Sequence, residues 1–85
     1  MGFPAARGRR PQRWVQDLRH LRVLRRQFAD AEGVPAYIVF SDATLREMAL
    51  RAPRTELELR SVPGVGPAKL ARYGDAFLEL LRGGE

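Results

Sequence analysis

The sequence predicts an all-α fold, a compact bundle of five helices, on three observations. Apolar residues recur at three- and four-residue steps in its longer segments, as they do along one face of a helix. Serine, threonine and proline stand where helices would begin, and glycine or proline where they would end. Only residues 36–40 are rich in strand-forming side chains, and a lone strand has nothing to pair with. The 85 residues have room for one domain with a single core.

The first expected helix runs from about Trp14 to Ala31. Five apolar residues form its inner stripe: Trp14, Leu18, Leu21, Leu24 and Phe28. Gly33 and Pro35 should end it, since proline disfavours helical geometry in the residue before it. Residues 36–40 are then expected to form a short helical turn that is buried in the bundle.

Capping residues mark the later helices. Ser41 is the expected N-cap of a third helix, with Asp42 favourable at the positive end of the helix dipole. Pro53 should close this helix, whose expected inner face is Leu45, Met48, Ala49 and Ala52. Thr55 and Glu58 have the spacing of a capping box that opens a short fourth helix.

The fifth expected helix starts at Pro67, which suits the first helical position. Its apolar face consists of Leu70, Tyr73, Phe77, Leu78 and Leu81. Gly74 lies inside this helix, where glycine costs roughly 1 kcal/mol relative to alanine, so we expect a close contact between helices there.

Positive charge is concentrated at the N-terminus. The chain has a net charge of +5 and a pI near 11. Of its fifteen lysines and arginines, four lie in residues 1–13, which leaves eleven basic residues against all ten acidic ones. We therefore expect a flexible basic arm or linker at 1–13, a nearly neutral helical domain at 14–82 and a tail at 83–85. The arm can bind phosphates whatever the fold does.

Composition excludes several classes of function. Without cysteine there is neither a disulfide nor a Cys-ligated zinc, and His20 is the only histidine. The carboxylates are scattered, so we expect no catalytic residues, no metal and no cofactor. No apolar run approaches a signal peptide or a membrane span. The expectation is a soluble, non-enzymatic monomer in the cytoplasm, nucleoid-associated if bacterial.

Residues 59–73, LRSVPGVGPAKLARY, have the pattern of a helix-hairpin-helix element. Glycines let the backbone approach a phosphate, and the first N–H groups of the following helix carry the positive end of its dipole. Gly64, Gly66 and Lys69 are therefore candidate phosphate contacts. The alternative is that the glycines only make a sharp turn between two packed helices.

A basic stripe is expected on the first helix, where Arg19, Arg22 and Arg26 share one side. Its alternative is an ordinary solvated face. Arg25 points instead to the apolar side, so we expect its stem to be buried and its head to pair with a carboxylate or with backbone carbonyls.

An exposed Tyr37 could stack on a single-stranded base, whereas the apolar residues around it favour packing in the core. Arginines around the third and fourth helices supply further charge. The complete predicted nucleic-acid interface is Tyr37, Arg51, Arg54, Arg60, Gly64, Gly66, Lys69, Arg72, Arg19, Arg22 and Arg26.

The segments VPAYIVFSDATL and VPGVGPAKLARYG, in this order and spacing, resemble the HRDC domain, the helicase and RNase D C-terminal module. The resemblance spans about residues 14–82. It implies a five-helix fold without its own catalysis, found in RecQ-type helicases, and an aromatic at position 37 that binds DNA in some members. Arg60 departs from the family pattern, which more often has an apolar residue there.

Two functions follow as hypotheses. The first is an accessory module that binds single-stranded or partly duplex DNA weakly and without sequence specificity, with RNA as the alternative nucleic acid. It would tune the substrate choice of a parent helicase or nuclease. The second is a docking module for a protein partner or a neighbouring domain, with little affinity for nucleic acid.

Overall fold

The computed structural model describes the backbone of residues 3–83 and the side chains of residues 13–83. Five helices and no strand occur in that part of the chain, which confirms the all-α prediction. The helices are α1 (Phe3–Glu32), α2 (Ala36–Val39), α3 (Asp42–Arg51), α4 (Glu56–Arg60) and α5 (Pro67–Leu81). None of these described helices is both long enough and apolar enough to cross a membrane.

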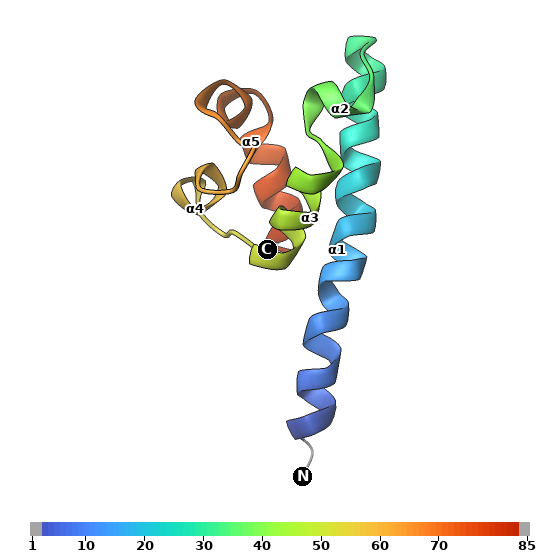
Figure 1. Ribbon diagram of the computed structural model, residues 1–85, viewed down its shortest axis with the longest axis vertical. Helices are drawn as coiled ribbons and strands as arrows, with labels where there is room; N and C mark the ends of the chain where they lie inside the picture. Colours follow the sequence, from blue (N-terminus) through green and yellow to red (C-terminus); the bar gives the residue numbers. More distant parts are fainter. Residues whose placement is uncertain (1–2, 84–85) are drawn as a thin grey trace.

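The bundle is built along α1, which is its longest element. In Figure 1, α2, α3 and α5 lie along the C-terminal half of α1, and α4 lies beyond α5, away from α1. The N-terminal part of α1 extends past the other helices, so the molecule measures 50 × 24 × 23 Å.

The start of α1 differs from the prediction. The sequence places it near Trp14, but the helix begins at Phe3. Alanines and arginines have high helix propensity, and adding residues to an existing helix avoids the cost of nucleation, which outweighs the glycine and prolines of this segment. Residues 1, 2, 84 and 85 and the side chains of 1–12 lie outside the described part, so the arm and the tail stay predictions.

The C-terminal end of α1 agrees with the prediction to within one residue. Gly33 has a φ of +69°, which is left-handed geometry that glycine adopts without strain. The N–H of Gly33 donates to the Asp30 carbonyl, and the N–H of Val34 donates to the Ala29 carbonyl at 3.0 Å. This pair of bonds is a Schellman motif, which satisfies carbonyls that the end of a helix leaves unpaired.

The predicted caps of α3 and α4 are confirmed. Ser41 accepts a hydrogen bond from the Thr44 N–H, and Thr55 accepts one from the Glu58 N–H. The Glu58 carboxylate reaches one residue further back than in a capping box and accepts from the Arg54 N–H at 2.8 Å.

Ala52 is the exception on α3, because it is exposed and left-handed with a φ of +48°. The proline that follows it disfavours helical geometry, so Ala52 leaves the helix and does not reach the inner face.

The core is an aromatic cluster surrounded by aliphatic residues. Phe40 packs against Tyr73 and Phe77 with ring centroids 5.6 and 5.0 Å apart, and Phe28 packs against the same two rings from α1. The Phe28–Phe77 pair is stacked and the other three are edge-to-face, and aromatic pairs in such arrangements add about 0.5–1.5 kcal/mol to the burial of apolar area. The predicted stripe of α1 supplies the rest of this wall, because Leu21 is fully buried and Trp14, Leu18 and Leu24 pack against the core.

Candidate nucleic-acid interface

The short helix α2 divides the apolar run at residues 36–40 between core and solvent. Val39 and Phe40 are buried, whereas Tyr37 is 67% exposed and Ile38 is 45% exposed. The predicted helical turn is confirmed, but its complete burial is wrong. Four helical residues at 100° per residue cannot all face the core, and the first turn of α2 points Tyr37 outward. Core packing of Tyr37, one of the two alternatives, is excluded.

Arg25 fixes the extended link between α2 and α3. Its Nη1 donates to the Phe40 carbonyl at 2.8 Å, and its Nη2 lies 2.8 Å from Asp42 Oδ1. The side chain is only 12% exposed. This confirms the prediction of a structural arginine with a buried stem. The planar guanidinium holds a carbonyl and a carboxylate at once, and so joins α1 to the segment that carries Tyr37.

Lys69 of α5 contacts the same link at the side chain of Phe40. Its Nζ is 5.7 Å from the centroid of the Phe40 ring, close enough for a cation–π contact. Phe40 follows Tyr37 by three residues, so Lys69 of α5 contacts the segment that begins with the exposed Tyr37.

The hairpin glycines have different roles. Gly64 has a φ of +93°, and a Cβ at this position would overlap the Thr44 hydroxyl. That hydroxyl donates to the Pro63 carbonyl at 3.0 Å, so α3 and the hairpin loop are held together at this point. Gly64 is therefore required by the fold.

Gly66 is the N-cap of α5, with a φ of −88°, and a Cβ there would meet nothing within 4 Å. Packing does not demand a glycine at this position. The missing side chain leaves the backbone open at the start of α5, beside Lys69, where unpaired N–H groups favour an anion.

The basic stripe of α1 meets α3. Arg19 and Arg22 are exposed, and Arg26 lies 3.8 Å from Asp30 with both side chains largely exposed. Arg46 of α3 is also exposed and lies one helical turn after Asp42, whose carboxylate contacts Arg25 of α1. Arg46 is not among the predicted interface residues. It is 24 positions from Arg22 in the sequence, and only the packing of α3 on α1 makes them neighbours.

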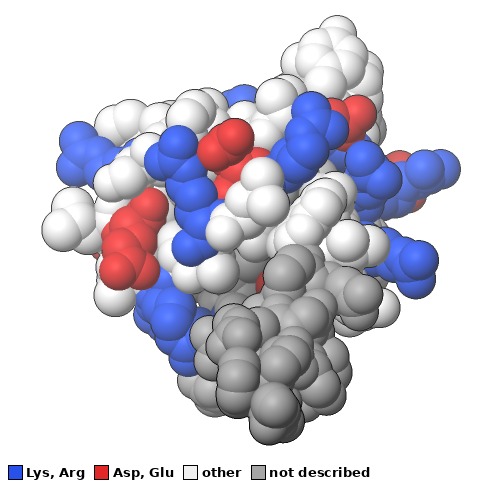
Figure 2. Space-filling view, turned by 60° about the horizontal axis from the view of Figure 1, so that its bottom comes forward, with Lys and Arg blue, Asp and Glu red and all other residues white. Residues whose placement is uncertain are grey.

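The remaining predicted arginines are dispersed. Arg51 pairs with Glu47 at 2.9 Å on α3, and Arg72 lies 3.4 Å from Glu32 near the end of α1. Arg54 and Arg60 are exposed at the two ends of the α4 region. Figure 2 shows acidic groups interspersed among the basic ones on the face in view. The eleven predicted residues therefore do not form one continuous surface.

Glu32 also binds Tyr73, whose hydroxyl donates to its carboxylate at 2.8 Å. Burial, and then the hydrogen bond and negative charge of Glu32, raise the pKa of Tyr73 above its ordinary value of 10.0. This contact joins α1 to α5 at the end of the bundle.

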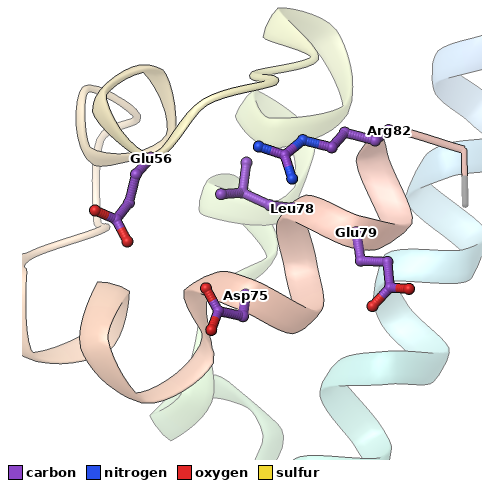
Figure 3. A pocket seen from close by; sticks show the side chains of 5 residues that line it. All are labelled: Glu56, Asp75, Leu78, Glu79 and Arg82. Carbon is purple, nitrogen blue, oxygen red and sulfur yellow. The ribbon is translucent and has the colours of Figure 1, made fainter. Parts of the chain in front are cut away.

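A hollow between α4 and α5 has a mainly acidic lining. It has a volume of about 360 Å³ and is lined by Glu56, Asp75, Leu78, Glu79 and Arg82. In Figure 3 the carboxylates of Glu56 and Asp75, from α4 and α5, face the same open space. Arg82 reaches across to donate from Nε to the Arg54 carbonyl at 2.8 Å. Within the described part of the chain, no three His, Asp or Glu side chains are placed to hold a metal ion.

Asp42 should make folding sensitive to acid. The Arg25 guanidinium, through its hydrogen bond and its charge, holds the pKa of Asp42 below the ordinary value of 3.8, with smaller contributions from Arg22 and Arg46. A lowered folded-state pKa stabilises the fold above the pKa of the unfolded chain, and this contribution is lost as the pH falls through the folded value. We expect the free energy of unfolding to fall below about pH 4, and to fall less in Asp42→Asn. Urea denaturation of both proteins across this range is the measurement, and equal acid sensitivity would contradict the expectation.

Comparison with known proteins agrees with the fold. The sequence profile of the HRDC domain matches residues 16–81. Over 62 residues the chain is 50% identical to the ATP-dependent DNA helicase RecQ of Haemophilus influenzae. This alignment covers 73% of the chain and 10% of the helicase. It is 41% identical over 66 residues to the ATP-dependent DNA helicase UvrD2 of Mycobacterium tuberculosis, covering 78% of the chain and 9% of the helicase.

A solved structure, D. radiodurans RecQ HRDC domain 3, superposes with a TM-score of 0.79 at 37% sequence identity. The match covers 82% of this chain and 92% of that domain. The chain thus spans about a tenth of the length of the helicases that it matches, and nearly the whole of the isolated domain. The match over residues 16–81, together with the shared arrangement of helices, shows that the chain belongs to the HRDC domain family.

Proposed function

We propose that this domain is a non-catalytic accessory module that binds single-stranded or partly duplex DNA weakly and without sequence specificity. It would tune the substrate choice of a RecQ-type helicase or a related DNA-processing enzyme. The observation that carries the proposal is the 67% exposure of the Tyr37 ring in an otherwise apolar segment. An exposed aromatic ring gives a base a surface for stacking, and every base has a face to stack.

Positive charge at the start of α5 supports the proposal. Gly66 leaves the N-cap of α5 open, and Lys69 contacts the ring of Phe40, which follows Tyr37 by three residues. A phosphate backbone that runs from Tyr37 past the start of α5 would meet this charge. With so few contacts, the affinity should resemble that of non-specific binders, with a Kd of about 10⁻⁴–10⁻⁶ M at physiological salt. Such a weak module acts by tethering, since linkage to a second DNA-binding domain raises its effective concentration.

We expect Tyr37→Ala to weaken binding of a single strand by about 1 kcal/mol, roughly fivefold, because a stacking surface is lost. Tyr37→Phe is the matched control, because it keeps the ring and should keep the affinity. Lys69→Ala should weaken binding and reduce the slope of log K against log salt by about 0.7, the value for one phosphate contact on a single strand. Fluorescence anisotropy with a labelled oligo(dT) strand measures all three variants.

An NMR titration of the full chain would locate the interface. Shifts confined to Tyr37, Gly66, Lys69 and their neighbours would support a binding face on the bundle. Shifts confined to residues 1–13, and binding abolished when Arg7, Arg9 and Arg10 are replaced by glutamine, would assign the affinity to the arm. In that case the proposed interface on the bundle is wrong.

A docking module is the second candidate, favoured by the charge distribution. Several arginines are already paired with carboxylates, and the α4–α5 hollow is acidic. A surface of mixed sign suits another protein domain better than a phosphate backbone. This candidate predicts that the variant with Arg7, Arg9 and Arg10 replaced by glutamine has negligible DNA affinity. The same variant should still associate with the other domains of a parent helicase in a pull-down.

A further inference from the structure

Asp42 lies among three arginines from two helices. It is at the first position of α3, and Arg46 follows one turn later on the same face. Arg25 of α1 contacts the Asp42 carboxylate at 2.8 Å, and Arg22 precedes Arg25 by one turn of α1. The contact therefore brings the start of α3 against the basic stripe of α1, as the packing of these two helices in Figure 1 shows.

The three arginines differ in what they are free to bind. Arg25 is 12% exposed, and both its terminal nitrogens are already engaged, one by the Phe40 carbonyl and one by Asp42. Arg22 and Arg46 are exposed, and neither forms an ion pair with a described residue. The group has three positive charges and one negative charge, so a net positive charge of two faces solvent between α1 and α3.

Asp42 itself is held in place but open to solvent. Its side chain is 62% exposed, although one oxygen is bound by Arg25. Carboxylates and phosphates are both oxygen acceptors that guanidinium groups bind with charge-assisted hydrogen bonds. Asp42 therefore already presents to Arg22 and Arg46 the type of group that a nucleic-acid backbone would bring.

We propose that Arg22 and Arg46 form a phosphate-binding position for single-stranded DNA on the α1–α3 surface, and that Asp42 acts there as a built-in competitor that lowers its affinity. The inference rests on the proposed DNA-binding function and adds a site that is separate from Tyr37 and Lys69. A phosphate at this position is attracted by two exposed guanidinium groups and repelled by the fixed carboxylate. Asp42 thus limits affinity, whereas the other proposed contact residues increase it.

The test is Asp42→Asn in the full chain, measured by anisotropy with labelled oligo(dT). Asparagine is nearly isosteric and its carbonyl can still accept from Arg25, so the fold should be kept. We expect Kd to fall about three- to fivefold, which corresponds to the loss of one exposed carboxylate that repels the phosphate. The slope of log K against log salt should steepen by about 0.7, for one added phosphate contact. A purely structural role for Asp42 predicts the opposite sign, a weaker complex.

Asp75→Asn is the matched control. It raises the net charge by the same unit, but at the acidic hollow between α4 and α5. Equal gains from Asp42→Asn and Asp75→Asn would mean that affinity follows net charge alone and would overturn the proposal. Arg22→Gln with Arg46→Gln in the Asp42→Asn background should remove the gain, and a gain that survives both replacements would also overturn it. Asp42→Ser is a second variant, suited to a helix start, should the asparagine variant fold poorly.

This proposal and the proposed function fail in different ways. If Tyr37→Ala weakens binding while Asp42→Asn behaves like Asp75→Asn, the α1–α3 site is wrong and the function stands. If Tyr37→Ala and Lys69→Ala have no effect while Asp42→Asn alone increases affinity, the α1–α3 site stands and the Tyr37 surface is wrong. Absence of binding by the wild-type chain and by every variant at low salt would overturn both.

Discussion

Replacing Gly64 with alanine should lower the free energy of unfolding by about 3 kcal/mol, from left-handed strain of about 1–2 kcal/mol and overpacking of about 1–3 kcal/mol. The φ of +93° lies where side chains are rarely tolerated. The added Cβ would also overlap the Thr44 hydroxyl, which is held between Ser41 and the Pro63 carbonyl. Thr44 is buried and cannot turn away without leaving that carbonyl unsatisfied, so the hairpin loop itself must move.

Urea denaturation followed by far-ultraviolet circular dichroism measures this loss. Gly66→Ala is the control, two residues away in the same loop, with a φ of −88° and open space around it. It should cost only about 0.5–1 kcal/mol, the usual difference between a tolerated N-cap and alanine. If Gly64→Ala were as stable as Gly66→Ala, the hairpin loop would not pack closely against Thr44 of α3.

Replacing Arg25 with alanine is the second large effect, and we expect a loss of about 2–3 kcal/mol. The substitution removes a buried hydrogen bond from a charged group, which is usually worth about 1.5–3 kcal/mol, and leaves the Phe40 carbonyl without its partner. It also breaks the ion pair with Asp42, whose exposure keeps that part of the loss small. Arg25→Lys should recover only part of the stability, because an ammonium group cannot contact both acceptors in the geometry of a planar fork.

Arg26→Ala is the matched control for this prediction. Arg26 is the next residue on α1, its side chain is 77% exposed, and its pair with Asp30 is 3.8 Å long. Its removal should change the stability by less than about 0.5 kcal/mol. The Tyr37 and Phe40 amide signals should move in Arg25→Ala and not in Arg26→Ala. Similar stabilities for the two variants would show that Arg25 does not hold the α2–α3 link.

Local signals in the sequence were sufficient for most of the fold. Ser41, Thr55 and Pro67 start helices because capping and the fixed φ of proline are decided by neighbouring residues. The start of α1 was missed because glycine and proline near residues 8–11 indicate a break, whereas the attached helix allows the segment to continue it. The sequence places Ala52 on the inner face of α3, but the helix ends one residue earlier, at Arg51.

The candidate site was less predictable, because its geometry comes from tertiary packing. The exposure of Tyr37 depends on how α2 docks on α1, and the apolar residues around it indicate the opposite. Arg25 could be predicted as structural, since it lies on the apolar side of its own helix. No sequence pattern joins Arg46 to Arg22, because they belong to different helices whose contact is set by the core. The different roles of Gly64 and Gly66 likewise depend on a threonine about twenty residues away.

Phe40 contacts one residue beside each of the two proposed DNA-binding sites. Its carbonyl is bound by Arg25 on the α1 side, and its ring lies beneath Lys69 on the α5 side. If both proposed sites bind DNA, a single strand that displaces Lys69 and one that displaces Arg25 would both change the surroundings of Phe40. Any coupling between the two proposed sites would be reciprocal, so each would change the affinity of the other by the same factor. A buried phenylalanine that makes no contact with DNA would in this way set how strongly the two sites depend on each other.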